Sequence, residues 1–106
     1  MFFELRRYRD VTGRVPLSEW LSELSNVTAG RVQAYIDRMK AGNFGASRSV
    51  EDGVSELKIN FGPGYRVYYL RDGKSVVVLL CGGDKTSQEK DIQQARQYAF
   101  DYWRRR

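Results

Sequence analysis

The chain has 106 residues, with 18 lysines and arginines against 13 aspartates and glutamates, which gives a formal net charge of +5 at pH 7. Hydrophobic residues make up 42% and charged residues 29%, values that exclude a disordered or membrane-spanning chain. The length suits one domain, 1–106, with a single core. Histidine is absent, which excludes histidine-based acid–base catalysis, Ser-His or Cys-His triads and nearly all common zinc sites.

The positive charge suits a polyanionic partner such as RNA or DNA, or an acidic protein. The longest apolar run, residues 76–81, is far too short to cross a bilayer, and the first residues lack the basic start and apolar core of a signal peptide. We therefore expect a cytoplasmic protein with no membrane partner. The single cysteine, Cys81, lies in that apolar run and is expected to be a buried small residue.

The first half of the chain predicts one strand and a pair of helices. Alternation within residues 2–9 indicates a strand that joins the main sheet. Pro16 suits the first position of a helix that ends at Ser25-Asn26 and has an apolar stripe of Leu17, Trp20, Leu21 and Leu24. Thr28 is the expected N-cap of a second helix reaching about residue 41, and Gly42 is its stop. The two helices are expected to form an antiparallel hairpin, followed by a loop over residues 43–53.

Residues 54–81 predict three consecutive antiparallel strands. Polar and apolar residues alternate in the first two, and matching their faces places Leu57 opposite Val67 and Lys58 opposite Arg66. The glycines of the intervening turn, Gly62-Pro63-Gly64, can adopt positive φ. The third strand has no polar face, which is typical of a central strand covered on both sides.

The last part of the chain predicts a helix that begins with the capping-box pattern of Thr86 and Glu89, ends in three arginines, and buries Ile92, Ala95, Ala99, Tyr102 and Trp103. Gly82-Gly83 before it matches no phosphate-loop spacing, so a structural turn is favoured over an anion site. The predicted fold class is α+β, with an N-terminal strand, a helical hairpin, an antiparallel sheet of three to four strands and a C-terminal helix.

Cations on the polar face of the predicted sheet indicate a phosphate site. Lys58 and Arg66 repel each other across the strands unless an anion lies between them, and Lys85 follows the third strand toward the same edge. Such a cluster can promote cleavage of RNA by its own 2′-OH, because arginine stabilises the pentavalent phosphate and a lysine can exchange the proton. The chemistry needs no metal or cofactor. The further residues expected to contact RNA are Arg48, Tyr68, Tyr102 and Arg104.

Four segments, residues 42–45, 53–59, 62–69 and 79–85, resemble the "addiction module killer protein" branch of the RelE/HigB toxins of type II toxin–antitoxin systems. The resemblance implies the RelE/ParE fold and an mRNA endonuclease that acts on the ribosome and is neutralised by a cognate antitoxin in a hetero-oligomer. It implies that Arg66, in Tyr-Arg-Val, serves the scissile phosphate. Lys58 stands where the family usually has arginine, which keeps the charge but loses bidentate geometry. It also implies catalytic roles for Lys85 and for Tyr98 or Tyr102.

Two alternatives remain open at this point. One is a ParE-like toxin that inhibits DNA gyrase by protein contact and cleaves nothing, and the other is a small basic binding module without activity. Fold alone does not separate them from a nuclease.

Overall fold

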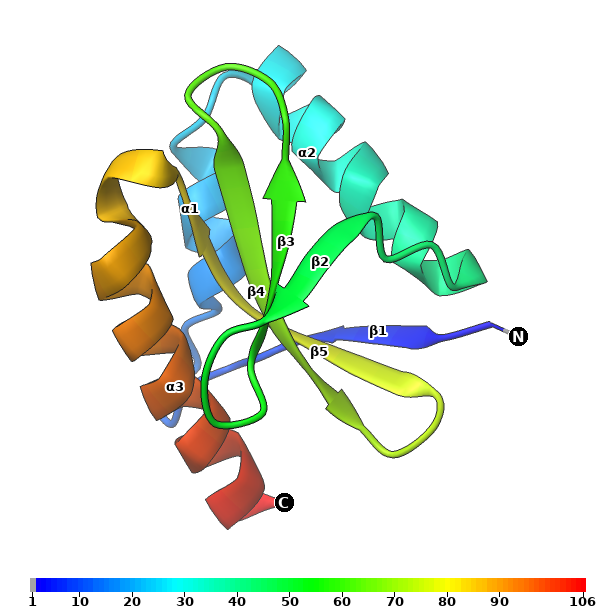
Figure 1. Cartoon of the computed structure of the whole chain (residues 1–106). Coiled ribbons are helices and arrows are strands. Elements are labelled where there is room, and N and C mark those ends of the chain that lie inside the picture. Colours follow the sequence, from blue (N-terminus) through cyan, green and yellow to red (C-terminus); the bar gives the residue numbers. More distant parts are fainter. Residues whose placement is uncertain (1) are drawn as a thin grey trace.

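A five-stranded mixed sheet separates two layers of helices (Figure 1). The computed structural model describes residues 2–106. The strands run in the spatial order β1-β5-β4-β3-β2, and their bounds are β1 (Glu4–Arg7), β2 (Ala46–Ser49), β3 (Ser55–Ile59), β4 (Tyr65–Asp72) and β5 (Val76–Gly83). The α+β class with an N-terminal strand is confirmed.

The sheet differs from the prediction in two respects. β1 pairs parallel to β5, so the sheet is mixed and not purely antiparallel. β2 lies within the segment that was expected to be a loop, and it pairs antiparallel with β3, which makes the fifth strand. Its sequence, Ala-Ser-Arg-Ser, carries no apolar alternation because β2 is an edge strand with mostly exposed side chains.

The predicted register of β3 and β4 is confirmed. Leu57 pairs with Val67, and Lys58 pairs with Arg66. The apolar partners therefore share one face of the sheet, and the cations share the other.

Helices cover both faces of the sheet. On one face, α1 (Pro16–Ser22), α2 (Asn26–Arg38) and the short 3-10 turn η1 (Met39–Ala41) cover a core built from Leu17, Val32, Ile36, Met39, Leu57, Ile59, Val67, Tyr69, Val77 and Leu79. On the other face, α3 (Gln88–Arg105) covers Tyr8, Val54, Tyr68, Leu70, Val78, Leu80, Cys81, Ala95 and Ala99. β5 contributes to both cores, which confirms the central, doubly covered strand, and Cys81 is buried as expected.

Within residues 2–106 we find no helix of the length and apolar character needed to span a bilayer.

The first helix begins at Pro16 as predicted, whereas the predicted N-caps of the other two helices are displaced, by three residues for α2 and by one for α3. Ser25, not Thr28, caps α2, because the extended Ser25 backbone places its hydroxyl oxygen 3.2 Å from the Thr28 N–H that donates to it. The capping box at Thr86 does not form. The Asp84 carboxylate accepts the Thr86 N–H at 2.8 Å and opens a 3-10 turn, η2 (Lys85–Ser87), before α3 begins at Gln88. Gly42 ends the α2–η1 segment with φ 85°, as predicted.

The Gly82-Gly83 pair lies at the end of β5, where other elements approach closely. A Cβ on Gly82 would overlap the indole ring of Trp20 in α1, and a Cβ on Gly83 would overlap the Asp91 carboxylate in α3. The absence of side chains therefore allows both helices to pack on β5, which supports the structural interpretation of these glycines.

Candidate phosphate-binding site

Three predicted cations meet at one end of the sheet. Strand pairing places Arg66 of β4 between Lys58 of β3 and Gly83 of β5, and Lys85 follows directly in η2. Together with the β3–β4 turn they line an open depression of about 410 Å³, formed by Lys58, Asn60, Phe61, Gly62, Pro63, Gly64, Arg66 and Lys85. The expectation that these three cations share one place is confirmed, and their chemical roles stay predictions.

The guanidinium of Arg66 is held in place from two sides. It is only 6% exposed, and its Nη1 donates to the carbonyl of Gly64 at 2.9 Å. Gly64 has φ 81°, a conformation that favours glycine, so the turn sequence places this acceptor beside the arginine. On the other side, Nε lies 3.7 Å from Oε2 of Glu56 and has no hydrogen-bond partner in residues 2–106.

Glu56, which the sequence analysis did not identify as a site residue, connects three elements at this end of the sheet through its carboxylate. Its side chain is buried, and it accepts hydrogen bonds from Nε of Arg48 in β2 at 3.0 Å and from Nε2 of Gln88 in α3 at 2.9 Å. Burial opposes ionisation, but these hydrogen bonds outweigh it and hold the pKa of Glu56 below its ordinary value. Arg48, an expected RNA contact, is thus an ion-pair partner whose side chain stays 61% exposed.

Two signals in the sequence would have indicated Glu56. It lies two residues before Lys58 on the same face of the strand, and the predicted register places it opposite Tyr68. A carboxylate on a face that also carries two cations is their natural counter-ion.

Tyr68 is not available to stack on a base, which corrects its expected role. The residue is 0% exposed because α3 covers it, and its hydroxyl has no hydrogen-bond partner in the described part of the chain. Burial and the neighbouring Glu56 carboxylate raise the pKa of its phenol far above the ordinary value. Tyr68 is therefore part of the core.

The remaining candidates on α3 lie away from the cations. Tyr98 packs on Tyr8 with ring centroids 4.9 Å apart and lines a separate pocket between α1 and α3. Tyr102 donates its hydroxyl to Asp72 at the far end of β4, and Arg104 lies on the surface beside Asp101. At 1.5 Å per residue, Tyr102 is about 21 Å along the helix axis from Gln88. The expectation that a helix tyrosine completes the cation cluster is wrong.

The geometry suits the binding of an anion by donors of two kinds. Arg66 offers a buried, oriented guanidinium, whereas Lys58 and Lys85 offer exposed point charges at the rim. Among residues 2–106, no three His, Cys, Asp or Glu side chains gather in a way that could hold a metal ion.

Two comparisons show which known proteins the chain is similar to. A protein of Haemophilus influenzae, described as uncharacterized, is 51% identical to the chain over 78 residues, which are 73% of this chain and 79% of that protein. The family model described as "Phage derived protein Gp49-like" matches residues 19–99, a range that includes Lys58, Arg66 and Lys85. The chain therefore belongs to the Gp49-like family of phage-derived proteins, which is associated with toxin–antitoxin systems.

Proposed function

We propose that the chain is the toxin of a type II toxin–antitoxin module, and that it cleaves mRNA on the ribosome until a cognate antitoxin neutralises it. The observation that carries the proposal is the convergence of Lys58, Arg66 and Lys85 on one depression of about 410 Å³. A volume of that order accommodates a phosphate with its adjoining sugars.

The proposed reaction is attack of a ribose 2′-OH on the adjacent phosphorus, with breakage of the bond to the 5′-oxygen. The products are a 2′,3′-cyclic phosphate and a 5′-hydroxyl end. Water accepts the proton that the 2′-OH loses as it attacks, and Arg66 donates to the phosphate oxygens as negative charge grows on them. The ammonium groups of Lys58 and Lys85 stabilise that charge, and one of them supplies a proton to the leaving 5′-oxygen and regains it from water. Positioning of the mRNA by the ribosome supplies much of the rate, because the chain has no histidine to act as acid or base near neutral pH.

The antitoxin is proposed to cover the same cations. Its carboxylates would form charge-assisted hydrogen bonds with Arg66, Lys58 and Lys85 and would exclude RNA phosphate. The net charge of +5 and the toxin–antitoxin association of the family support this partner. Pull-down with the product of the neighbouring open reading frame at about 0.15 M salt tests it.

Induced expression of variants tests the nuclease. Because Arg66 is buried beside Glu56, Arg66→Ala is expected to lower stability as well as toxicity, so the sharper variant is the exposed pair Lys58→Ala/Lys85→Ala. We expect the wild type to truncate cellular mRNA and the double variant to leave it intact at equal expression and unchanged Tm. The matched control is Arg38→Ala, an exposed arginine of α2 that stacks on Tyr35 outside the depression.

Two results would overturn the proposal. A DNA-damage response with intact mRNA would indicate gyrase inhibition. Full mRNA cleavage by Lys58→Ala/Lys85→Ala would show that the depression is not the cleavage site. Purified protein is expected to cleave naked RNA poorly, and robust cleavage without ribosomes would contradict the ribosome-dependent mechanism.

A further inference from the structure

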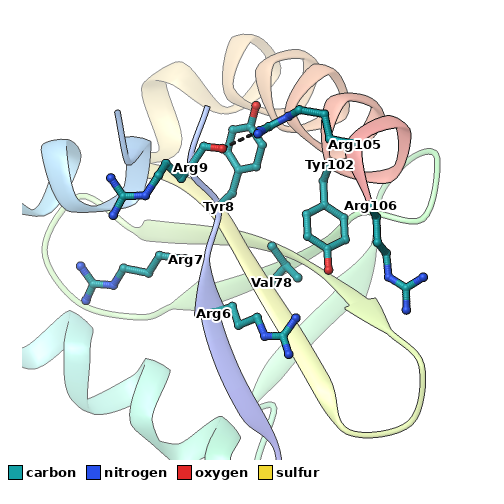
Figure 2. A pocket seen from close by; sticks show the side chains of 8 residues that line it. All are labelled: Arg6, Arg7, Tyr8, Arg9, Val78, Tyr102, Arg105 and Arg106. Atoms are coloured by element: carbon teal, nitrogen blue, oxygen red, sulfur yellow. Dashed lines mark hydrogen bonds between the residues drawn. The ribbon is translucent and has the colours of Figure 1, made fainter. Parts of the chain in front are cut away.

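A second basic pocket lies at the opposite end of α3 from the phosphate-binding depression (Figure 2). It has a volume of about 320 Å³ and lies between the β1 segment and the last turn of α3. Five of its eight lining residues are arginines and none is acidic, and the full set is Arg6, Arg7, Tyr8, Arg9, Val78, Tyr102, Arg105 and Arg106. The sequence predicted that one lining residue, Tyr102, contacts RNA, but it did not predict the arginine pocket, and the proposed cleavage does not use it.

The side chains do not all enter the pocket. In Figure 2, Arg6, Tyr102 and Arg106 gather around Val78, whereas Arg7 and Arg9 extend away to the other side of the strand. Arg7 donates to Ser18 and Gln33 on the opposite face of the sheet, each at 2.7 Å. The binding groups are therefore Arg6 and Arg106, whereas Arg105 turns toward the β1 segment and donates its Nη2 to the carbonyl of Arg9 at 2.6 Å.

Carboxylates outside the lining hold these groups in place. Tyr102 and Nε of Arg106 both donate to Asp72, and Nε of Arg6 donates to Glu4. Both guanidiniums are thus engaged through Nε, which leaves their terminal nitrogens for a ligand. The Arg6 and Arg106 side chains are 52% and 59% exposed, so a ligand can reach them.

Arg105 is fixed through its terminal Nη2, which lies 2.7 Å from Oδ2 of Asp101, as well as through its Nε, so it orders the wall of the pocket and is not counted as a binding group. Its Nε donates to Asp101 at 2.9 Å, and Asp101 also accepts the hydroxyl of Tyr8 at 2.6 Å. Hydrogen bonds from Tyr8 and Arg105 lower the pKa of Asp101 to about 2. The arginines around the pocket are therefore ordered before any ligand binds, which lowers the entropic cost of binding.

We propose that this pocket binds phosphate groups of an RNA backbone, so that the protein holds RNA at two places, one at each end of α3. The inference rests on the proposed function for its choice of RNA. The 18 residues of α3 separate the two places by about 27 Å. The pocket thus contacts RNA well outside the cleaved phosphodiester.

The lining favours RNA over an acidic protein segment. Val78 is the only aliphatic residue among those that line the pocket, whereas a protein interface needs an apolar core. Arginine forks match phosphate oxygens, and interfaces with nucleic acid are polar and rich in positive charge. Next to the pocket, Trp103 is 45% exposed and lies against Tyr102 and Arg106, where its ring offers a surface for base stacking.

Binding is measured by fluorescence anisotropy in the Lys58→Ala/Lys85→Ala background, which isolates the second pocket from the depression. The probes are a 20-nucleotide single-stranded RNA, an RNA hairpin of equal length and a polyglutamate peptide, each over a range of salt concentrations. The pocket variant adds Arg6→Ala and Arg106→Ala, and the matched control adds Arg38→Ala and Arg71→Ala, two exposed arginines outside the pocket. Thermal melts confirm that every variant is folded.

We expect the pocket variant to bind RNA at least about tenfold more weakly at 0.1 M salt. Its slope of log K against log salt should fall by about 1.4, since each lost phosphate contact is worth about 0.7 on a single strand. The control should stay within about twofold. Preference for the single strand or for the hairpin identifies which RNA form the pocket takes, and either supports the proposal.

Unchanged affinity and slope in the pocket variant would overturn the inference, as would tighter pocket-dependent binding of polyglutamate than of RNA. Cleavage separates this inference from the proposed function. With Lys58 and Lys85 intact, Arg6→Ala/Arg106→Ala should raise KM for ribosome-bound mRNA at an unchanged kcat. If the wild type cleaves nothing, the proposed function fails, and the anisotropy result still decides the pocket.

Discussion

Replacing Gly82 by alanine should force α1 away from the sheet. A Cβ at this position would lie 2.9 Å from Cδ2 of Trp20 and closer still to two other ring atoms, against 3.4–4 Å for ordinary contact. Rotation of the indole is opposed on one side by Tyr65, because the two ring centroids are 6.0 Å apart. The strain must therefore be relieved by movement of the helix.

The size of the effect follows from the geometry. Overpacking of a core costs about 1–3 kcal/mol, and a rigid ring that meets the new methyl at three atoms places Gly82→Ala at the upper end. For 106 residues the entropy of unfolding near 60 °C is about 0.22 kcal/mol/K, at about 2.1 cal/mol/K per residue. A loss of about 3 kcal/mol then lowers Tm by about 13 °C.

Gly30→Ala is the matched control, and it is expected to raise the stability of the protein where Gly82→Ala lowers it. Gly30 lies within α2, and apart from its chain neighbours and the backbone of its own helix no heavy atom comes within 4 Å of an added Cβ. Alanine should stabilise the helix by about 0.8–1 kcal/mol and raise Tm by about 4 °C. Thermal unfolding followed by circular dichroism measures both variants. A Gly82→Ala protein that melts with the wild type would refute the close approach of Trp20 to β5.

Three further outcomes are expected. Glu56→Gln should cost about 3 kcal/mol at pH 7, because it leaves Arg66 buried without its counter-charge. The folded pKa of Glu56 is lowered, so its charge stabilises the protein above the unfolded pKa, and the Tm difference from wild type should shrink as pH falls below about 4. Leu57→Ala should lower stability by about 2–4 kcal/mol in thermal melts, since Leu57 is 1% exposed. Native Cys81, whose pKa burial raises to about 12, should react with iodoacetamide at pH 8 far more slowly than in urea, and equal rates would contradict its burial.

Local patterns predicted the centre of the sheet well. The alternation around Leu57 and Val67 admits one register that keeps apolar residues together, and that register placed Lys58 opposite Arg66. The all-apolar β5 likewise required cover on both faces. These features were predictable because burial imposes them on the sequence.

Features that depend on tertiary placement were not predictable in this way. β2 forms because β3 offers a free edge, and nothing in Ala-Ser-Arg-Ser requires a strand. The helical period correctly placed Ala95 and Ala99 on the buried face of α3. It does not tell where along the sheet the helix lies, which is why Tyr98 and Tyr102 were wrongly expected beside Arg66. Tyr68 was misplaced for the same reason, because α3 covers it.

The parallel pairing of β1 with β5 also sets an order of folding. β3, β4 and β5 are joined by short turns, whereas pairing Glu4 with Val76 closes a loop of about 70 residues. We therefore expect the three-stranded meander to form early and β1 to dock late, after most of the chain has become ordered. During synthesis β1 leaves the ribosome before any other strand of this sheet and has no partner until β5 has emerged. Weakening β1 should consequently speed unfolding more than it slows folding.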